Sequence, residues 1–210
     1  MGQSMNKDID FLYEVGALRR LGRAWNQFLN PDAQNITEHT FRVIFLALIL
    51  ARLEKVNPVR KSGRTVSNGA SSDEKILKFA LIHDLPESRT NDFHAGMKLY
   101  SSRDEERAAR DLFANTSLGS EFAKLFTEYQ KRDSIEAKIV KDADTLDIDL
   151  ELQEQEARGN NLKKYCPDRQ MFYKKLYTKS ARKMFREIQK SEPHKWHMEL
   201  RNRYNRTQEN

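Results

Sequence analysis

The stretch KFALIHDLPESRTNDF, from Lys78 to Phe93, is the part of the sequence from which fold and chemistry are best argued. A largely apolar run from Ile76 to Ile82 leads into the adjacent pair His83 and Asp84, and Pro86 then disturbs a regular helix. Neighbouring helical side chains point about 100° apart, so the pair can share one ion only near a helix end or with favourable rotamers. Imidazole and carboxylate together suit divalent Mn, Fe, Co or Zn. We therefore predict a buried helix that ends at a metal-binding pair.

Two further blocks flank this pair in chain order. His39 lies upstream in TEHTFRV, and Asp144 lies downstream in VKDADTLD. The ordered set His, His-Asp, Asp resembles the HD superfamily of metal-dependent phosphohydrolases. The three blocks together look like the 5′-deoxynucleotidase branch of that superfamily, over residues from about Arg23 to about Leu152. Each block alone is common by chance, whereas three blocks in the family's order are specific.

The resemblance implies an all-α fold, a helical bundle of about seven to nine helices. It also implies one bound divalent cation, and the identity of this ion among Mn, Co, Fe, Zn and Mg stays open because such ligands accommodate several of them. The implied ligands are His39, His83, Asp84 and Asp144.

The resemblance assigns further roles around the ion. Glu87 matches a carboxylate that orients or activates the attacking water, and Asp92 falls where the relatives contact the sugar. Arg23 and Trp25 fall near the residues that hold phosphate and shape the sugar pocket. The relatives usually place this arginine and tryptophan side by side, whereas Ala24 separates them here. That departure leaves the preference for deoxyribose open.

The residues themselves leave structural alternatives beside these roles. Glu87 lies four residues after His83 and can serve as a general base near the ion, or it can cap a turn. Arg23 and Trp25 can equally be a surface arginine and a core tryptophan. His39 can be a capping or core histidine rather than a ligand.

Asp144 also has an alternative close by. The family's Ala-Asp pair before a leucine matches ADTL here, which favours Asp144, and Asp142 is the second choice. A carboxylate beside the apolar stripe of its helix needs a partner, because burying an unpaired charge is expensive. A metal ion would be that partner.

Apolar residues at helical spacing predict the remaining elements. For the helix that begins at Asn35, we expect a capping box with Glu38 and a core stripe of Phe41, Ile44, Phe45, Leu48 and Ala51. In the helix over residues 134–157, Asp142, Asp147 and Asp149 are expected on faces away from the core. The predicted helices cover residues 8–22, 35–54, 72–82, 134–157, 171–190 and 193–203, with two more between 104 and 134.

The expected domain organisation is a single HD domain over residues 1–204 with a core at about 23–152. Residues 56–72 combine Pro, Gly, Ser and Asn without apolar periodicity, so we expect an inserted flexible loop there. The polar residues 205–210 are expected to form a disordered tail.

Composition narrows the classes of protein further. The chain has 210 residues and one cysteine, Cys166, which excludes an intramolecular disulfide and fits a reducing cytoplasm. No apolar run approaches a membrane span, and the start MGQSMNKDIDF lacks the apolar core of a signal peptide. We expect a cytoplasmic protein. The net charge of +6 gathers in the C-terminal third, where a solvated helix face is favoured over a nucleic-acid surface.

Three functional hypotheses follow. The first is a metal-dependent phosphomonoester hydrolase acting on nucleoside 5′-monophosphates, with deoxynucleotides preferred. The second keeps the HD site but acts on another nucleotide or phosphoester. The third is a nucleic-acid-binding helical protein with a structural metal, whose binding would weaken steeply with salt. A homodimer is compatible with the basic C-terminal helices.

Overall fold

The computed structural model describes residues 2–27, 33–56, 72–160 and 169–208. Within these ranges the regular structure is helical, and an isolated antiparallel bridge joins Gly22 to Asn35. The predicted all-α fold is therefore confirmed. The helices are α1 (Gly2–Ala17), η1 (Leu18–Arg20), η2 (Ala24–Gln27), α2 (Ile36–Leu53), α3 (Ser72–Ile82), α4 (Glu87–Thr90), η3 (Met97–Leu99), α5 (Glu105–Phe113), α6 (Gly119–Lys131), α7 (Ile135–Ala157), α8 (Arg169–Lys175), α9 (Lys179–Ile188) and α10 (Lys195–Gln208).

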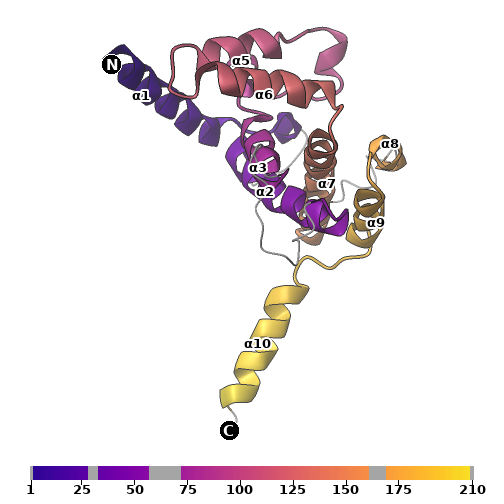
Figure 1. Cartoon of the computed structure of the whole chain (residues 1–210). Coiled ribbons are helices and arrows are strands. Elements are labelled where there is room, and N and C mark those ends of the chain that lie inside the picture. The colour runs from indigo at the N-terminus through magenta and orange to yellow at the C-terminus, as the bar shows by residue number, and fades with distance from the viewer. Residues whose placement is uncertain (1, 28–32, 57–71, 161–168, 209–210) are drawn as a thin grey trace, which may run out of the picture.

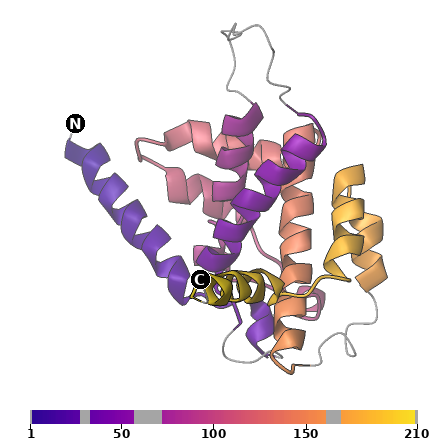
Figure 2. The ribbon, with the colours of Figure 1, turned by 90° about the horizontal axis from the view of Figure 1, so that it is seen from below.

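The centre of the molecule is formed by α2, α3 and α7, which all pack on one another. The hairpin of α5 and α6 covers one end of this centre, and α9 lies along α7 (Figure 1). The two terminal helices α1 and α10 project from the body (Figures 1 and 2). Fully buried side chains such as Leu50, Phe79, Phe126 and Leu146 fill the core. Each such side chain contributes about 1.5–3 kcal/mol of transfer free energy.

The start of α2 matches the prediction. The Asn35 side chain accepts hydrogen bonds from the backbone of Thr37 and Glu38, and the Glu38 side chain accepts one from the Asn35 backbone. This reciprocal capping box satisfies donors that would otherwise lack partners at the first turn. It fixes the turn that carries His39.

The predicted core stripe of α2 is wrong for its aromatic residues. Phe41 is 65% exposed and Phe45 is 54% exposed, while Ala51 is buried as expected. The helix has two apolar stripes, and the core takes the one that contains His39 and Val43. Periodicity could not favour this stripe, because a histidine interrupts it.

The first helix begins earlier than predicted and ends earlier. Its range is Gly2–Ala17, so Asp8, the first residue of the predicted range, lies inside the helix, and η1 continues the chain before Gly22. Asp8 instead accepts hydrogen bonds from the backbone and hydroxyl of Ser117, in the connection between α5 and α6. These bonds tie α1 to the body of the protein.

The helix α7 differs from the prediction on its polar faces. Asp142, Asp147 and Asp149 are all buried, whereas faces away from the core were expected for them. Because α2, α3 and α9 all pack against α7, little of its circumference remains for solvent. Three buried carboxylates therefore need partners within the fold.

The C-terminal region also departs from the prediction. The expected helix over 171–190 is two helices, because the helical conformation is interrupted between α8 and α9. Thr178 caps α9, since its hydroxyl accepts a hydrogen bond from the Ala181 amide. The helix α10 continues to Gln208, so residues 205–208 are helical where a disordered tail was expected. Neither Gly nor Pro interrupts the sequence there.

Some expectations fall on residues that the structure does not describe. The predicted loop insertion at 56–72 lies almost wholly in residues 57–71, outside the described ranges, as do Cys166 and the last two residues of the predicted tail. None of the described helices combines the length and apolarity needed to cross a bilayer.

Candidate metal centre

The central helix ends as the sequence predicts. α3 stops at Ile82, and the backbone then turns through His83 and Asp84 into the single-turn helix α4. The Leu85 amide donates to the Ile82 carbonyl at 3.2 Å, and the Glu87 amide donates to the Asp84 carbonyl at 3.0 Å. These turns release the pair from regular helical geometry, so both side chains can face one point.

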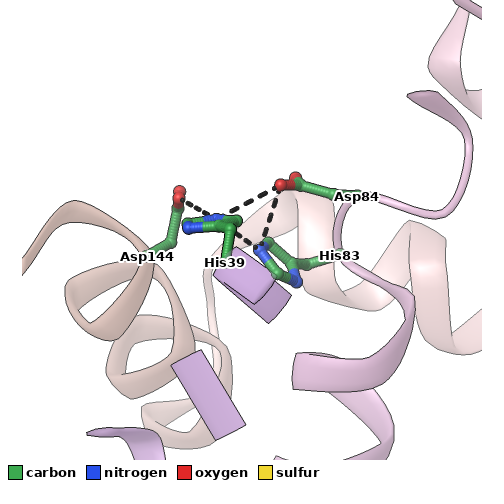
Figure 3. A group of neighbouring side chains, drawn as sticks. All are labelled: His39, His83, Asp84 and Asp144. Atoms are coloured by element: carbon green, nitrogen blue, oxygen red, sulfur yellow. Dashed lines mark hydrogen bonds and ion pairs between the residues drawn. The ribbon is translucent and has the colours of Figure 1, made fainter. Parts of the chain in front are cut away.

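Four of the sequence-predicted residues meet at this point (Figure 3). His39 comes from the first turn of α2, His83 and Asp84 follow α3, and Asp144 comes from α7. One nitrogen or oxygen atom of each side chain lies within 4.8 Å of the others. Nε2 of His39 lies 3.3 Å from Asp84 Oδ2, 3.2 Å from Asp144 Oδ1 and 3.3 Å from Nε2 of His83.

The Nδ1 atom of each imidazole is hydrogen-bonded to a group outside the cluster. Nδ1 of His83 lies 2.8 Å from the Ala80 carbonyl, and Nδ1 of His39 lies 2.6 Å from Asp147 Oδ2. Each Nδ1 therefore carries the proton that it donates, which leaves both Nε2 lone pairs directed at the common point. A carboxylate or carbonyl behind a ligating histidine is the usual support of a metal site.

The donor set fits a divalent cation. Bonds of about 2.1 Å at angles of about 90–109° place neighbouring ligand atoms about 3.0–3.4 Å apart. The spacings around His39 Nε2 fall in this range, and two carboxylates would neutralise a dication. Two Nε2 lone pairs at 3.3 Å need a cation or a proton between them. His39, His83, Asp84 and Asp144 are thus the residues that would hold such an ion.

The pKa values of the cluster reflect the same electron-rich environment. Burial lowers the pKa of His39, but hydrogen bonds to Asp144, Asp147 and Asp84 outweigh burial and raise it well above its usual range. Burial lowers the pKa of the His83 imidazole. The carboxylates thus stabilise a positive charge at the cluster. A bound dication would supply this charge in place of a proton on His39.

Asp147 is a component of the site that sequence reasoning missed. Its fully buried carboxylate accepts hydrogen bonds from the Gln34 side chain at 2.7 Å and from Nε of Arg42, in addition to His39. It therefore fixes the ring of His39 from behind. The available signal was its position three residues after Asp144, which places both side chains on neighbouring parts of one helix face.

The alternative ligand Asp142 faces another way. Its carboxylate accepts hydrogen bonds from the backbone of Tyr177 and from the backbone and hydroxyl of Thr178. These bonds join α7 to the start of α9. The geometry consequently favours Asp144 over Asp142 as the candidate ligand.

Glu87 lies beside the cluster on α4 and is buried. Its Oε1 accepts a hydrogen bond from Nη1 of Arg103 at 3.0 Å, while its Oε2 is buried without a hydrogen-bond partner. Burial raises the pKa of Glu87 to about 9, and the negative charges of Asp84 and Asp92 add to this rise. Sequence reasoning did not single out Arg103.

Two of the predicted substrate residues, Arg23 and Asp92, contact each other beside the cluster. Nη1 of the buried Arg23 lies 3.1 Å from Asp84 Oδ2, and its Nε lies 3.3 Å from Asp92 Oδ2. Asp92 Oδ2 also accepts a hydrogen bond from the Ala24 amide at 3.0 Å. Trp25 belongs to η2, next to Ala24, but its side chain is outside what the structure describes.

A cavity of about 1320 Å³ opens onto these groups. Its wall includes His83, Asp84, Asp144, Glu87, Arg23 and Asp92. Lys141 also lines it and donates to Asp144 Oδ2 at 2.6 Å, a cation that sequence reasoning did not single out. Metal donors, a buried carboxylate and several cations thus share one cavity large enough for a nucleotide.

Comparisons with known proteins agree with this geometry. The family model described as HD domain matches residues 15–189. The chain is 26% identical over 159 residues to 5′-deoxynucleotidase HDDC2 of Danio rerio, covering 72% of this chain and 71% of the relative. It is 29% identical over 164 residues to 5′-deoxynucleotidase YfbR of Escherichia coli, covering 74% and 77%.

Among solved structures, a conserved hypothetical protein from Pyrococcus furiosus is 29% identical, with a TM-score of 0.68 over 87% of this chain and 99% of that one. The PH0347 protein from Pyrococcus horikoshii is 28% identical, with a TM-score of 0.58 over 94% and 98%. The sequence match, the all-α fold and the four converging side chains all point to the same family, and the family model spans most of the chain. The chain therefore belongs to the HD domain family of metal-dependent phosphohydrolases.

Proposed function

We propose that this hydrolase removes phosphate from nucleoside 5′-monophosphates, with deoxynucleotides as the preferred substrates. The observation that carries the proposal is the shared cavity, whose wall includes Glu87, Arg23 and three of the four candidate ligands, His83, Asp84 and Asp144, with His39 in contact with them. Two relatives named 5′-deoxynucleotidase support the substrate class. The reaction releases inorganic phosphate and a nucleoside.

The candidate ligands His39, His83, Asp84 and Asp144 would hold one divalent cation. When bound, such an ion supplies a Lewis acid for a phosphoryl oxygen and acidifies water. Its positive charge also offsets the two ligand carboxylates, so that an anionic phosphate can enter the site.

Arg23 is the residue that we propose to bind the phosphate. Its guanidinium is buried at the cavity wall between Asp84 and Asp92, so both carboxylates hold its orientation. A planar guanidinium can offer two parallel donors to phosphate oxygens. Asp92 is in turn fixed by the Ala24 amide and is the candidate partner of a sugar hydroxyl.

Glu87 is the residue that we propose to take a proton from the attacking water. Arg103 occupies one carboxylate oxygen, and the other oxygen, Oε2, is buried without a hydrogen-bond partner. The positive charge of a bound dication favours the ionised form of this carboxyl group, whose pKa burial otherwise raises. As water adds to phosphorus, its proton passes to Oε2 and the phosphorus–O5′ bond breaks; the nucleoside oxygen takes up a proton from solvent, and Glu87 later releases its own proton to solvent.

Phosphate release from a panel of substrates tests this proposal. The panel contains deoxy- and ribonucleoside 5′-monophosphates, 3′-monophosphates, nucleoside triphosphates and cyclic dinucleotides, each with Mn, Co and Mg. We expect the 5′-monophosphates to be hydrolysed fastest, and the deoxy forms faster than the ribo forms. Faster hydrolysis of triphosphates or cyclic phosphodiesters would instead support an HD hydrolase with another substrate.

The role of Glu87 has its own test. In Glu87→Gln we expect kcat to fall about 10²–10⁴-fold because the proton acceptor is lost, with metal content unchanged. Elemental analysis of the same sample separates this effect from loss of the ion. A Glu87→Gln enzyme with unchanged kcat would exclude this carboxylate as the base.

A further inference from the structure

Arg103 is a buried cation that contacts the site from outside the metal cluster. It lies between η3 and α5, and its side chain is 13% exposed. Nη1 donates to Glu87 Oε1 at 3.0 Å and to the Asn91 carbonyl at 2.5 Å, and Nη2 pairs with Glu105. One guanidinium thus holds three acceptors, from α4, from the residue that ends α4 and from α5.

The first of these contacts fixes the rotamer of Glu87. A carboxylate held at Oε1 cannot rotate freely, so its unpartnered Oε2 keeps one direction. A general base must hold its accepting oxygen within hydrogen-bond reach of the water that it deprotonates. Without Arg103, the side chain could turn away from the cluster.

The second contact fixes the loop that carries Asp92. Asn91 ends α4 with a φ of 62° and a ψ of 162°, a backbone conformation that is costly for a residue other than glycine. The hydrogen bond from Arg103 to its carbonyl stabilises this conformation. Asp92 follows directly and reaches Arg23 and the Ala24 amide, so its position depends on the turn at Asn91.

The guanidinium is itself held in place from two sides. Glu105 pairs with it and also accepts a hydrogen bond from the Gln130 side chain at 2.8 Å. The ring of Phe93 lies 5.1 Å from the guanidinium carbon, within the range of a cation–π contact. A planar fork held in this way can serve several acceptors at once, which the single nitrogen of lysine cannot do equally well.

We propose that Arg103 is a positioning residue of the hydrolysis, which aims the Glu87 carboxylate at the attacking water and fixes Asp92 beside the substrate. The proposal rests on the proposed roles of Glu87 and Asp92. The proposal gives Arg103, in the connection between η3 and α5, a role in catalysis.

Kinetics of Arg103→Met and Arg103→Lys test the proposal. Arg103→Met keeps much of the apolar length of the side chain, and we expect kcat to fall about 10–100-fold and KM to rise. We expect Arg103→Lys to recover part of kcat, because one ammonium can still hold Glu87. Metal content and thermal unfolding are measured on each variant to confirm an intact fold and site.

A double-mutant cycle with Glu87→Gln separates positioning from a general structural role. If Arg103 acts on kcat through Glu87, Arg103→Met lowers kcat little further once Glu87 is Gln. A structural role predicts the same fold loss of kcat in both backgrounds. That result, or an unchanged kcat in Arg103→Met, would overturn the proposal.

Arg89→Met is the matched control. Arg89 belongs to α4 itself and, like Arg103, pairs with a carboxylate, but its partner is Glu14 on α1 and it does not line the cavity. We expect Arg89→Met to keep the wild-type kcat and KM. An equal loss of kcat in Arg89→Met would show that any arginine pair near α4 matters, and would contradict a specific role of Arg103.

The substrate assignment can fail without the positioning role. If the wild type releases phosphate only from other phosphoesters, the nucleoside 5′-monophosphate proposal is rejected. The same variants are then compared on the ester that the wild type hydrolyses fastest. The positioning role is supported or overturned there by the same kcat criteria.

Discussion

Asp147 illustrates how a residue outside the ligand set can control the candidate metal site. Its Oδ2 accepts a hydrogen bond from Nδ1 of His39, with the two atoms 2.6 Å apart, and hydrogen bonds from Gln34 and Arg42 fix the carboxylate in turn. The buried His39 has no freedom to reorient while these bonds persist. Metal affinity should therefore depend on a carboxylate that does not face the ion.

We expect Asp147→Asn to weaken metal binding about 10–100-fold, because the ring of His39 loses a charged partner. The measurement is a titration of the metal-free protein with Mn or Co. Asp142→Asn is the control, since it removes another buried carboxylate of α7, one that binds the start of α9. It should lower thermal stability but leave metal affinity unchanged, and equal affinity losses in both variants would contradict the assignment.

At the residue scale, the sequence allowed the prediction of those residues that a motif marks. His39, His83, Asp84 and Asp144 come together as their order in the chain led us to expect. For Asp147 the one signal was its spacing from Asp144, and for Lys141 and Arg103 there was none, because their contacts depend on the rotation of α7 and on the path of the loop before α5. Such contacts arise from tertiary packing and leave no local pattern.

At the scale of elements, the first turn of α2 connects helix stability to the site. Asn35 caps the helix four residues before His39, and the His39 amide donates to the Asn35 carbonyl at 3.0 Å. In Asn35→Ala we expect a loss of about 1 kcal/mol in the free energy of unfolding, because the first-turn amides lose their acceptor. Urea unfolding measures this loss, and Asn35→Asp, which can still cap, is the control. Equal stability of Asn35→Ala and the wild type would contradict the role of the cap.

The contact between α1 and α4 gives a prediction about pH. Glu14 accepts hydrogen bonds from Nε and Nη2 of Arg89 and from the Ser88 hydroxyl, and the Arg89 guanidinium lowers the pKa of Glu14 below its ordinary value of 4.5. The unfolded chain then binds more protons than the folded one in acid, so this contribution is present above pH 4.5 and is lost as the pH falls through the lowered pKa.

In Glu14→Gln we expect the free energy of unfolding at pH 7 to fall by about 0.5–1 kcal/mol, a modest amount because the pair is partly exposed. The difference from the wild type should shrink as the pH falls below 4.5 and through the lowered pKa of Glu14, as judged by urea unfolding at pH 7 and in a series of acidic buffers. Asp10→Asn, which removes a pair within α1, serves as the control. A difference that persists undiminished in acid would exclude ionisation of Glu14 as its cause.

The existence of most helices followed from the sequence, whereas the faces that they bury did not. Capping signals and periodicity gave α2, α3 and α7. The exposed Phe41 and Phe45 show the limit of this reasoning. Two apolar stripes compete on α2, and only the neighbouring helices determine which stripe packs inward.

At the scale of the molecule, the candidate ligands connect the three central elements. They come from α2, from the turn after α3 and from α7, which together form the core. An ion that binds the folded but not the unfolded chain adds to stability by mass action, about 2.7 kcal/mol at a free concentration one hundred times Kd. We expect a chelator to lower Tm and added Mn or Co to restore it. A Tm that is insensitive to both would contradict a metal that joins these elements.

The claim that the four candidate ligands hold one divalent ion needed for hydrolysis is tested most directly by metal content. We compare the purified wild type with His83→Ala by elemental analysis together with phosphate release. We predict about one divalent ion per chain in the wild type, and neither bound ion nor turnover in His83→Ala. His94→Ala, which removes another histidine of the cavity wall, should keep the ion. A His83→Ala protein that retains turnover without bound metal would contradict the account.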